Sequence, residues 1–149
     1  MKLVLQRVTR ASVTVDDDCV ASIGRGALVF IGIAKGDTPF DAAYLARKTS
    51  QLRVYDDLDG RLNSSIGDVC GAFLVVSQFT LYGECKKGNR PSYIEAATPA
   101  EAIPLYEEYM NQLESLGHEV QRGVFQEHMK VELVNDGPVT IILESRGRQ

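Results

Sequence analysis

The sequence predicts a single α/β domain in which a mixed, largely antiparallel sheet packs with two main helices. Two long apolar runs, Ala27–Ile33 and Ala72–Ser77, are typical of buried strands. Two other stretches begin Thr-Pro, at Thr38 and Thr98, and continue with apolar residues at helical spacing. The length of 149 residues suits one core, and no repeat, linker or low-complexity segment divides residues 1–149.

The first third of the chain is expected to be β-structure. Apolar residues interspersed with polar ones over 3–8, followed by the β-branched run 12–15, predict the first strand. The acidic run 16–18 predicts a turn into a second strand over 19–24. The run 27–33 is continuously apolar, so it is expected to be a buried central strand.

The first helix is expected to begin after Thr38. Thr38 can cap it, Pro39 suits the first helical position, and Asp41 stands where a capping box has its acid. The residues at helical spacing that predict its buried face are Ala42, Leu45, Ala46, Thr49 and Leu52.

The second helix repeats this pattern from Thr98, with Glu101 as the capping-box acid. Pro104 is expected to bend or delay the helix, and Gly117 to end it. Its predicted buried face consists of Ala102, Leu105, Tyr106, Tyr109, Leu113 and Leu116.

The remaining elements are short. A strand is predicted at 53–55, with a turn at 56–60. Near the end of the chain, strands are predicted at 130–134 and 139–143, joined by a turn at Asn135-Asp136-Gly137-Pro138.

Composition excludes some classes of protein and leaves others open. A net charge of −4 argues against a surface coated in positive charge for nucleic acid, although a local basic patch remains possible. No apolar run reaches the roughly 18 residues of a membrane span, and Lys2 and Arg7 come too early for a signal-peptide core. The expected location is therefore the cytoplasm.

Motifs for metal, redox or triad chemistry are absent from the sequence. The three cysteines, Cys19, Cys70 and Cys85, are far apart and form no CxxC pair, so reduced thiols and no metal or cofactor are expected. The two histidines, His118 and His128, are expected at the surface. No HxxxH, GxSxG, Walker or GxGxxG motif occurs, so any hydrolysis must work without the usual nucleophile–base pair.

Two segments are candidates for a site. Ser77-Gln78-Phe79-Thr80 follows a buried strand, which would hold polar groups rigidly, but hydroxyls that merely form a turn are equally compatible. Gly137-Pro138 can hold a cis peptide bond and approach a ligand closely, but an ordinary hairpin turn also fits.

Two further groups are candidates for RNA contacts. Lys86, Lys87 and Arg90 place three cations on one loop, where they can meet phosphates or simply be solvated. Phe125 and Met129 are four residues apart, so on a helical turn they would share an apolar face that could receive a nucleobase or pack in the core.

Taken together, the chain resembles the D-aminoacyl-tRNA deacylase family over nearly its whole length. The resemblance rests on Gln6–Val13, on Val75–Gly83 with Lys87–Ser92, and on Val134–Thr140. The signatures Ser-Gln-x-x-Leu and Gly-Pro-Val-Thr, in this order and at this spacing, are highly specific.

The resemblance implies an enzyme of chiral proofreading in translation, which hydrolyses D-aminoacyl-tRNA and should also accept glycyl-tRNA. It implies a homodimer with active sites at the interface, where a cis Gly137-Pro138 bond enters the partner's pocket as a chirality gate. The implied roles are the ester-receiving catalytic pocket for Ser77, Gln78, Phe79 and Thr80, the loop anchor for Arg7, and contact with the terminal adenosine for Phe125 and Met129.

The sequence departs from the family pattern between Phe125 and Met129. Family members often carry small residues and an Asp there, whereas this chain has Gln126-Glu127-His128, which concerns the contacts with the RNA end. Ser77 stands where a sister deacylase that removes L-alanine usually has Pro, so it favours the D-specific branch.

Two catalytic mechanisms remain open. Thr80 could attack as a nucleophile, although no base is evident to activate it. Alternatively, the 2′-hydroxyl of the terminal ribose assists water while main-chain N–H groups near Phe79 and Thr80 hold the oxyanion. We favour the second mechanism because it needs no His, Cys or acid.

Two other functions are also compatible with the residues. A nucleic-acid-binding module would bind RNA without cleaving an ester, even after loss of the Gln78 side chain. A small-molecule esterase or amidase would act on free D-aminoacyl esters, so a substrate without tRNA separates these possibilities.

Overall fold

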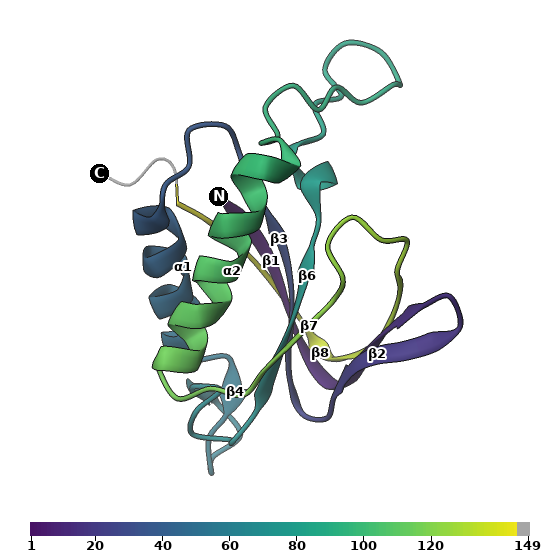
Figure 1. Cartoon of the computed structure of the whole chain (residues 1–149). Helices are drawn as coiled ribbons and strands as arrows, with labels where there is room; N and C mark the ends of the chain where they lie inside the picture. Colours follow the sequence, from purple (N-terminus) through teal and green to yellow (C-terminus); the bar gives the residue numbers. More distant parts are fainter. Residues whose placement is uncertain (146–149) are drawn as a thin grey trace.

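The computed structural model describes residues 1–145, so residues 146–149 of the predicted domain lie outside the described residues (Figure 1). Over the described part, no helix is both long enough and apolar enough to cross a bilayer. The elements are, in order, β1 (Lys2–Val15), β2 (Asp18–Ile23), β3 (Gly26–Gly32), α1 (Pro39–Gln51), β4 (Tyr55–Asp56), β5 (Leu62–Ser64), β6 (Ala72–Ser77), the 3-10 helix η1 (Phe79–Tyr82), α2 (Pro99–Ser115), β7 (Val120–Arg122) and β8 (Lys130–Glu144).

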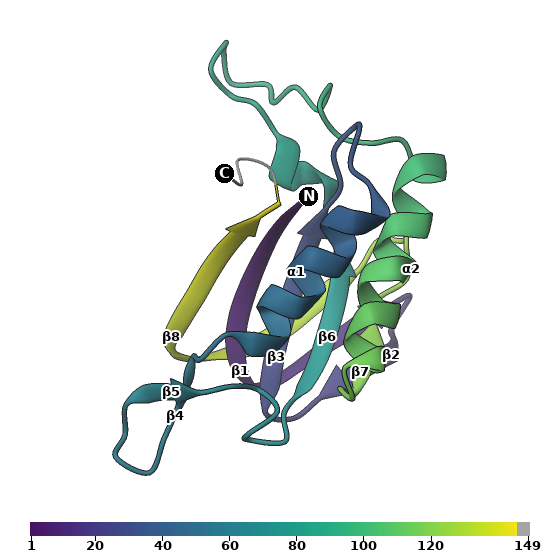
Figure 2. The same ribbon diagram turned by 90° about the vertical axis from the view of Figure 1, so that its left-hand side faces the viewer.

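The main sheet is mixed, as the sequence predicts. Its order is β2-β1-β3-β6-β7, and β8 pairs with β1. β1 runs antiparallel to β2, β3 and β8, whereas β3, β6 and β7 run parallel to one another. The strands β4 and β5 form a separate hairpin, and both helices lie on one face of the main sheet (Figures 1 and 2).

The long strand β1 changes partner half-way along. Its first half, Lys2–Val8, pairs with β3, and its second half, from Ala11 to Val15, pairs with β2. Because β8 follows the other side of β1 through both halves, β1 and β8 together connect two parts of the sheet.

Alternation along the central strands gives the molecule two apolar clusters. Val29 of β3 and Phe73 of β6 belong to a cluster that includes the buried faces of both helices. Leu28 and Leu74, their neighbours in sequence, belong to a second cluster with residues of β1 and β2. The continuous apolar runs of β3 and β6 arise because both faces of these strands are covered.

The predicted starts of both helices are confirmed, but two predictions about the second helix are wrong. Both capping boxes form; the Thr38 N–H, for example, donates to the Asp41 carboxylate at 2.9 Å. Pro104 lies inside α2, which nevertheless begins at Pro99, so the expected delay is wrong. Leu116 was expected to be buried but is 49% exposed, because the helix ends at Ser115 and Leu116 is its C-cap.

The predicted turn between two C-terminal strands is also wrong. Lys130–Glu144 is one strand, and both of its halves pair with β1. A hairpin would pair residues 130–134 with 139–143, but β1 is long enough to pair with both segments. Gln6 pairs with Thr140 and Val8 with Asn135, so residues 136–139 of β8 bulge out opposite Arg7. We call residues 136–139 the β8 bulge.

Candidate functional site

A cavity of about 630 Å³ opens where β3 and β6 end. This size is typical of small-molecule sites, and the walls are mostly apolar. Its lining consists of Ile31, Ile33, Val76, Ser77, Gln78, Phe79, Tyr93, Ala96, Ala97, Pro99, Ala102, Phe125, Gln126, Glu127, His128, Met129 and Val131. Three of the four residues predicted to catalyse therefore lie at one cavity.

The end of β6 fixes these residues. Ser77 is paired with Ile31 of β3, and the Gln78 N–H donates to the Ile31 carbonyl at 2.8 Å. The helix η1 begins at the next residue, so its first N–H groups, those of Phe79 and Thr80, have no acceptor among residues 1–145. Two main-chain donors are thus available at the end of a rigid strand.

Thr80 differs from its neighbours. It is exposed and does not line the cavity of residues 1–145. Its hydroxyl oxygen accepts a hydrogen bond from the Gln78 side-chain amide. The structure therefore gives Thr80 an amide donor, whereas a nucleophilic hydroxyl needs a base.

Tyr93 is a lining residue that the sequence reasoning missed. Its ring meets that of Phe79 edge to face, with centroids 5.1 Å apart and an interplanar angle of 70°. Phe79 is 57% exposed, so this pair presents aromatic surface to solvent beside the cavity. Tyr93 follows a polar loop and belongs to no apolar pattern. Apart from its aromatic side chain, nothing in the sequence indicates that it lines a site.

Phe125 and Met129 reach the cavity from an irregular segment. They lie between β7 and β8 in a turn, so the expected helical face is wrong, although both residues line the cavity. Phe125 also packs against the cluster below the helices, and Met129 against the second cluster. These two side chains therefore pack against the core and also line the cavity.

The ionisable side chains of the lining are few. They are Tyr93, Glu127 and His128, and all three are exposed. Beneath the cavity, burial raises the pKa of Tyr106 to about 12, and its hydroxyl donates to the Val75 carbonyl at 3.0 Å. Across residues 1–145, no three His, Cys, Asp or Glu side chains gather as metal ligands would.

The other histidine has a structural environment away from the cavity. His118 is half-buried rather than fully on the surface, and its Nε2 lies 2.6 Å from the Ser50 hydroxyl. Its ring meets Phe73 edge to face, and burial lowers its pKa.

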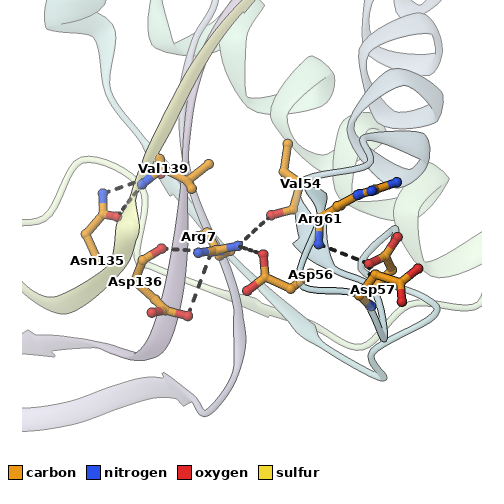
Figure 3. Close-up of polar contacts among 9 residues, drawn as sticks. Arg7, Val54, Asp56, Asp57, Arg61, Asn135, Asp136 and Val139 are labelled. Carbon is orange, nitrogen blue, oxygen red and sulfur yellow. Dashed lines mark hydrogen bonds and ion pairs between the residues drawn. The ribbon is translucent and has the colours of Figure 1, made fainter. Parts of the chain in front are cut away.

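Gly137 and Pro138 stand on the β8 bulge, away from the cavity of their own chain. Their peptide bond is cis, as the resemblance implies, and both residues are exposed. The Asn135 side chain closes the base of the bulge, because its Oδ1 accepts the Val139 N–H at 2.8 Å (Figure 3). Neither Gly137 nor Pro138 is among the residues that line the cavity in this chain.

Arg7 lies directly against the bulge. Its side chain is only 9% exposed, and Nε donates to the Asp136 carbonyl at 2.7 Å (Figure 3). A Cβ atom added to Gly137 would lie 3.2 Å from Arg7 Nη2. The residues that surround the Arg7 guanidinium were not predicted, because they lie 47 to 129 residues from it in the sequence. Asn135 has a local partner in Val139, but the sequence predicted only a turn there.

The three basic residues form a separate third group. Lys86, Lys87 and Arg90 are exposed on the loop between η1 and α2, which extends from the body of the molecule (Figure 1). Lys86 lies 3.4 Å from a Glu84 carboxylate oxygen, so part of the local positive charge is balanced. None of the three lines the cavity.

Comparison with known proteins gives a consistent result. The family model described as D-Tyr-tRNA(Tyr) deacylase matches residues 4–144. A protein named D-aminoacyl-tRNA deacylase from Desulforamulus reducens is 53% identical over 146 residues, covering 98% of each chain. One of the same name from Halalkalibacterium halodurans is 51% identical, covering 98% of this chain and all of its own.

Solved structures share the fold. The structure titled c-Myc DNA Unwinding Element Binding Protein has a TM-score of 0.91 and 41% identity, covering 97% of this chain and 98% of its own. A structure described as a probable eukaryotic D-amino acid tRNA deacylase has a TM-score of 0.81 at 16% identity, covering 96% and 98%. The second likeness concerns the fold alone.

Proposed function

The chain belongs to the D-Tyr-tRNA(Tyr) deacylase family, and on this basis we propose that it hydrolyses the ester bond of D-aminoacyl-tRNA at the cavity beside β6. The observation that supports this assignment at particular atoms concerns the N–H groups of Phe79 and Thr80 at the end of that strand, which have no acceptor within residues 1–145. Such donors stabilise an oxyanion that develops during attack on an ester carbonyl.

The proposed chemistry uses main-chain donors and the substrate's own ribose. The 2′-hydroxyl of the terminal adenosine assists the attacking water, while Phe125 and Met129 form the apolar surface under the adenine. The hydrogen bond from Gln78 to the Thr80 hydroxyl supports a positioning role for Thr80 rather than a nucleophilic one. The products are free tRNA and the amino acid, and no cofactor takes part.

The proposed assembly is a homodimer in which each β8 bulge enters the partner's cavity. Gly137 and Pro138 are exposed and remote from the cavity of their own chain, so they can reach a substrate there only from a second copy. A two-fold axis satisfies this requirement for both copies at once. Light scattering at assay concentration should give the dimer mass, and a monomer mass would contradict this arrangement.

Stereospecificity follows from rejection at Cα. An enzyme for many D-amino acids cannot read the side chain, so backbone atoms of Gly137 and Pro138 exclude the position that an L side chain would occupy. Glycine has no side chain to exclude, and glycyl-tRNA should therefore be cleaved too. The basic residues Lys86, Lys87 and Arg90 are proposed to contact tRNA phosphates, and the site of action is the cytoplasm.

The test uses one amino acid in both configurations. Purified protein is incubated with D-tyrosyl-tRNA and L-tyrosyl-tRNA, and the D substrate should be hydrolysed at least about a hundredfold faster, which corresponds to about 2.7 kcal/mol. Equal cleavage of both would defeat the proposal. Turnover of a D-tyrosyl ester without tRNA would favour a small-molecule esterase, and tRNA binding without cleavage a binding module.

A further inference from the structure

The guanidinium of Arg7 joins three elements that are distant in sequence. Arg7 itself belongs to β1, its Nε donates to the Asp136 carbonyl of the β8 bulge, and Nη1 donates to the Val54 carbonyl at 3.0 Å. Nη1 also lies 3.4 Å from the Asp56 carboxylate on β4 (Figure 3). One cation thus connects the bulge to the β4–β5 hairpin.

The Asp56 carboxylate balances a charge that has little contact with water. The Arg7 side chain is 9% exposed, and the carboxylates that face it are those of Asp56 and, at 3.8 Å from Nε, Asp136. Without Asp56, the guanidinium would be drawn towards the Asp136 carboxylate alone. That movement would disturb the hydrogen bond from Nε to the Asp136 carbonyl, which is the main-chain anchor of the bulge.

The loop of the β4–β5 hairpin is shaped by polar contacts, and the base of the hairpin is anchored in the core by Tyr55. The Asp57 carboxylate accepts the N–H groups of Asp59 and Arg61 at 2.8 and 3.0 Å. These hydrogen bonds lower the pKa of the Asp57 carboxyl, and the one from the Arg61 N–H contributes most. Leu58 and Leu62 are exposed, whereas Tyr55 of β4 is buried in the core cluster below the helices. On either side of Tyr55, the Val54 carbonyl and the Asp56 carboxylate are presented to Arg7.

We propose that Asp56 is a positioning residue for stereoselectivity, which holds the Arg7 guanidinium in the orientation that fixes the Gly137-Pro138 segment. This inference rests on the proposed function. It adds a residue outside the cavity that supports stereoselectivity by holding Arg7. The residue touches no substrate; it acts through Arg7 and the Asp136 carbonyl.

The consequence concerns L substrates more than D substrates. A bulge that is fixed less firmly samples more positions, and some of them leave room for an L side chain. Small misplacements of positioning groups have large effects on reaction rates. The proposed chemical step on a D substrate uses main-chain donors at Phe79 and Thr80. The Asp56 carboxylate contacts Arg7 rather than that segment, so this step should change little.

The decisive experiment compares Asp56→Ala with Asp59→Asn, a matched control that removes the same charge from the same hairpin. In Asp56→Ala, the ratio of L-tyrosyl-tRNA to D-tyrosyl-tRNA cleavage should rise about tenfold, the loss expected from one charge-assisted contact. The D rate should stay within about twofold of wild type. Asp56→Glu, which keeps the carboxylate, should restore most of the selectivity, and Asp59→Asn should match wild type.

A measurement without substrate tests the same contact. Hydrogen exchange of the Arg7 Nε–H, followed by NMR, should be about tenfold faster in Asp56→Ala and unchanged in Asp59→Asn. Wild-type selectivity in Asp56→Ala, or unchanged exchange at Arg7, would overturn the inference while leaving the deacylase assignment standing. A wild-type protein that cleaves D and L substrates equally would instead defeat the proposed function.

Discussion

The cavity beside β6 and the bulge on β8 are opposite kinds of structure in one chain. The cavity is concave, mostly apolar and built from the ends of strands, and the N–H groups of Phe79 and the adjacent Thr80 have no acceptor among residues 1–145. The bulge is exposed and held from beneath by the polar side chains of Arg7 and Asn135. The two regions are therefore suited to different tasks: the cavity can enclose a substrate, and the exposed bulge can present main-chain atoms to one.

This contrast explains how specificity and chemistry can be separated. Under the proposed function, the cavity would accept esters of many amino acids, because its main-chain donors would contact the carbonyl rather than the side chain. The bulge can exclude one configuration without taking part in bond cleavage. Changes at the cavity should therefore alter the rates for D and L substrates together, and changes at the bulge should alter their ratio.

The largest expected effect lies on the cavity side and comes from the RNA rather than the protein. A tRNA that ends in 2′-deoxyadenosine, charged with D-tyrosine on its 3′-hydroxyl, should be cleaved at least about a thousandfold more slowly than the normal substrate. The reason is that the assisting 2′-hydroxyl has been removed. Normal cleavage of this deoxy substrate in a single-turnover assay would contradict the ribose-assisted mechanism.

The next largest expected effect concerns tRNA binding rather than the cavity or the bulge. Lys86, Lys87 and Arg90 lie outside the cavity and the bulge, so changing all three to Ala should weaken tRNA binding more than tenfold at low salt. The slope of log affinity against log salt should fall by about 2. The ratio of D to L cleavage should not change. An unaltered slope would mean that these residues are simply solvated and do not contact tRNA phosphates.

A smaller effect is expected from Thr80→Ala. If the Thr80 hydroxyl only helps to orient Gln78, its loss removes one hydrogen bond, about 1 kcal/mol, and slows D cleavage at most about tenfold. The effect should be the same for D and L substrates, because the Thr80 hydroxyl contacts the cavity residue Gln78 rather than the bulge. A folded Thr80→Ala variant that binds tRNA but has lost activity by many orders of magnitude would identify Thr80 as the nucleophile.

The smallest effect concerns stability. Thr98 caps α2, whose residues Pro99 and Ala102 line the cavity, and its side chain hydrogen-bonds to Glu101 of the same helix. Thr98→Ala should lower the free energy of unfolding by about 1 kcal/mol in urea denaturation, as loss of an N-cap does. D-to-L selectivity should stay at the wild-type value, and a changed ratio would show that the two regions are coupled through the helix.

Local sequence signals predicted the parts of the fold that depend on neighbouring residues. The capping boxes at Thr38 and Thr98 and the strand that ends at Ser77 are such cases. The β8 bulge was mistaken for a hairpin turn because its residues look like a turn, whereas pairing of both flanks with β1 is a long-range property. The same holds for the Asp56–Arg7 contact, which joins positions 49 residues apart.

The site was predictable to a similar degree. The segment 77–79 follows a buried strand, so a position at its end was expected, and Phe125 and Met129 reach the same cavity without the predicted helical turn. Tyr93 was missed because only the folded chain brings it to Phe79. The roles of all these residues remain predictions for the experiments above.

The most direct test of the division between cavity and bulge is a subunit-mixing experiment. One variant, Gln78→Ala, impairs the cavity. The other, Gly137→Val, impairs the bulge, because even a Cβ there would lie 2.8 Å from the Val139 side chain at a φ of +141°. Each variant alone should cleave D-tyrosyl-tRNA about a hundredfold more slowly than wild type. Unlike a change that only loosens the bulge, Gly137→Val adds a side chain that would obstruct the partner's cavity for both configurations.

The two variants are then unfolded together and refolded at equal concentration. If the bulge works in the partner's cavity, each mixed dimer has one intact site, and the mixture should recover about a quarter of wild-type D cleavage with wild-type selectivity. If cavity and bulge act within one chain, the mixture will show only the average of its two parents. That result would contradict the account.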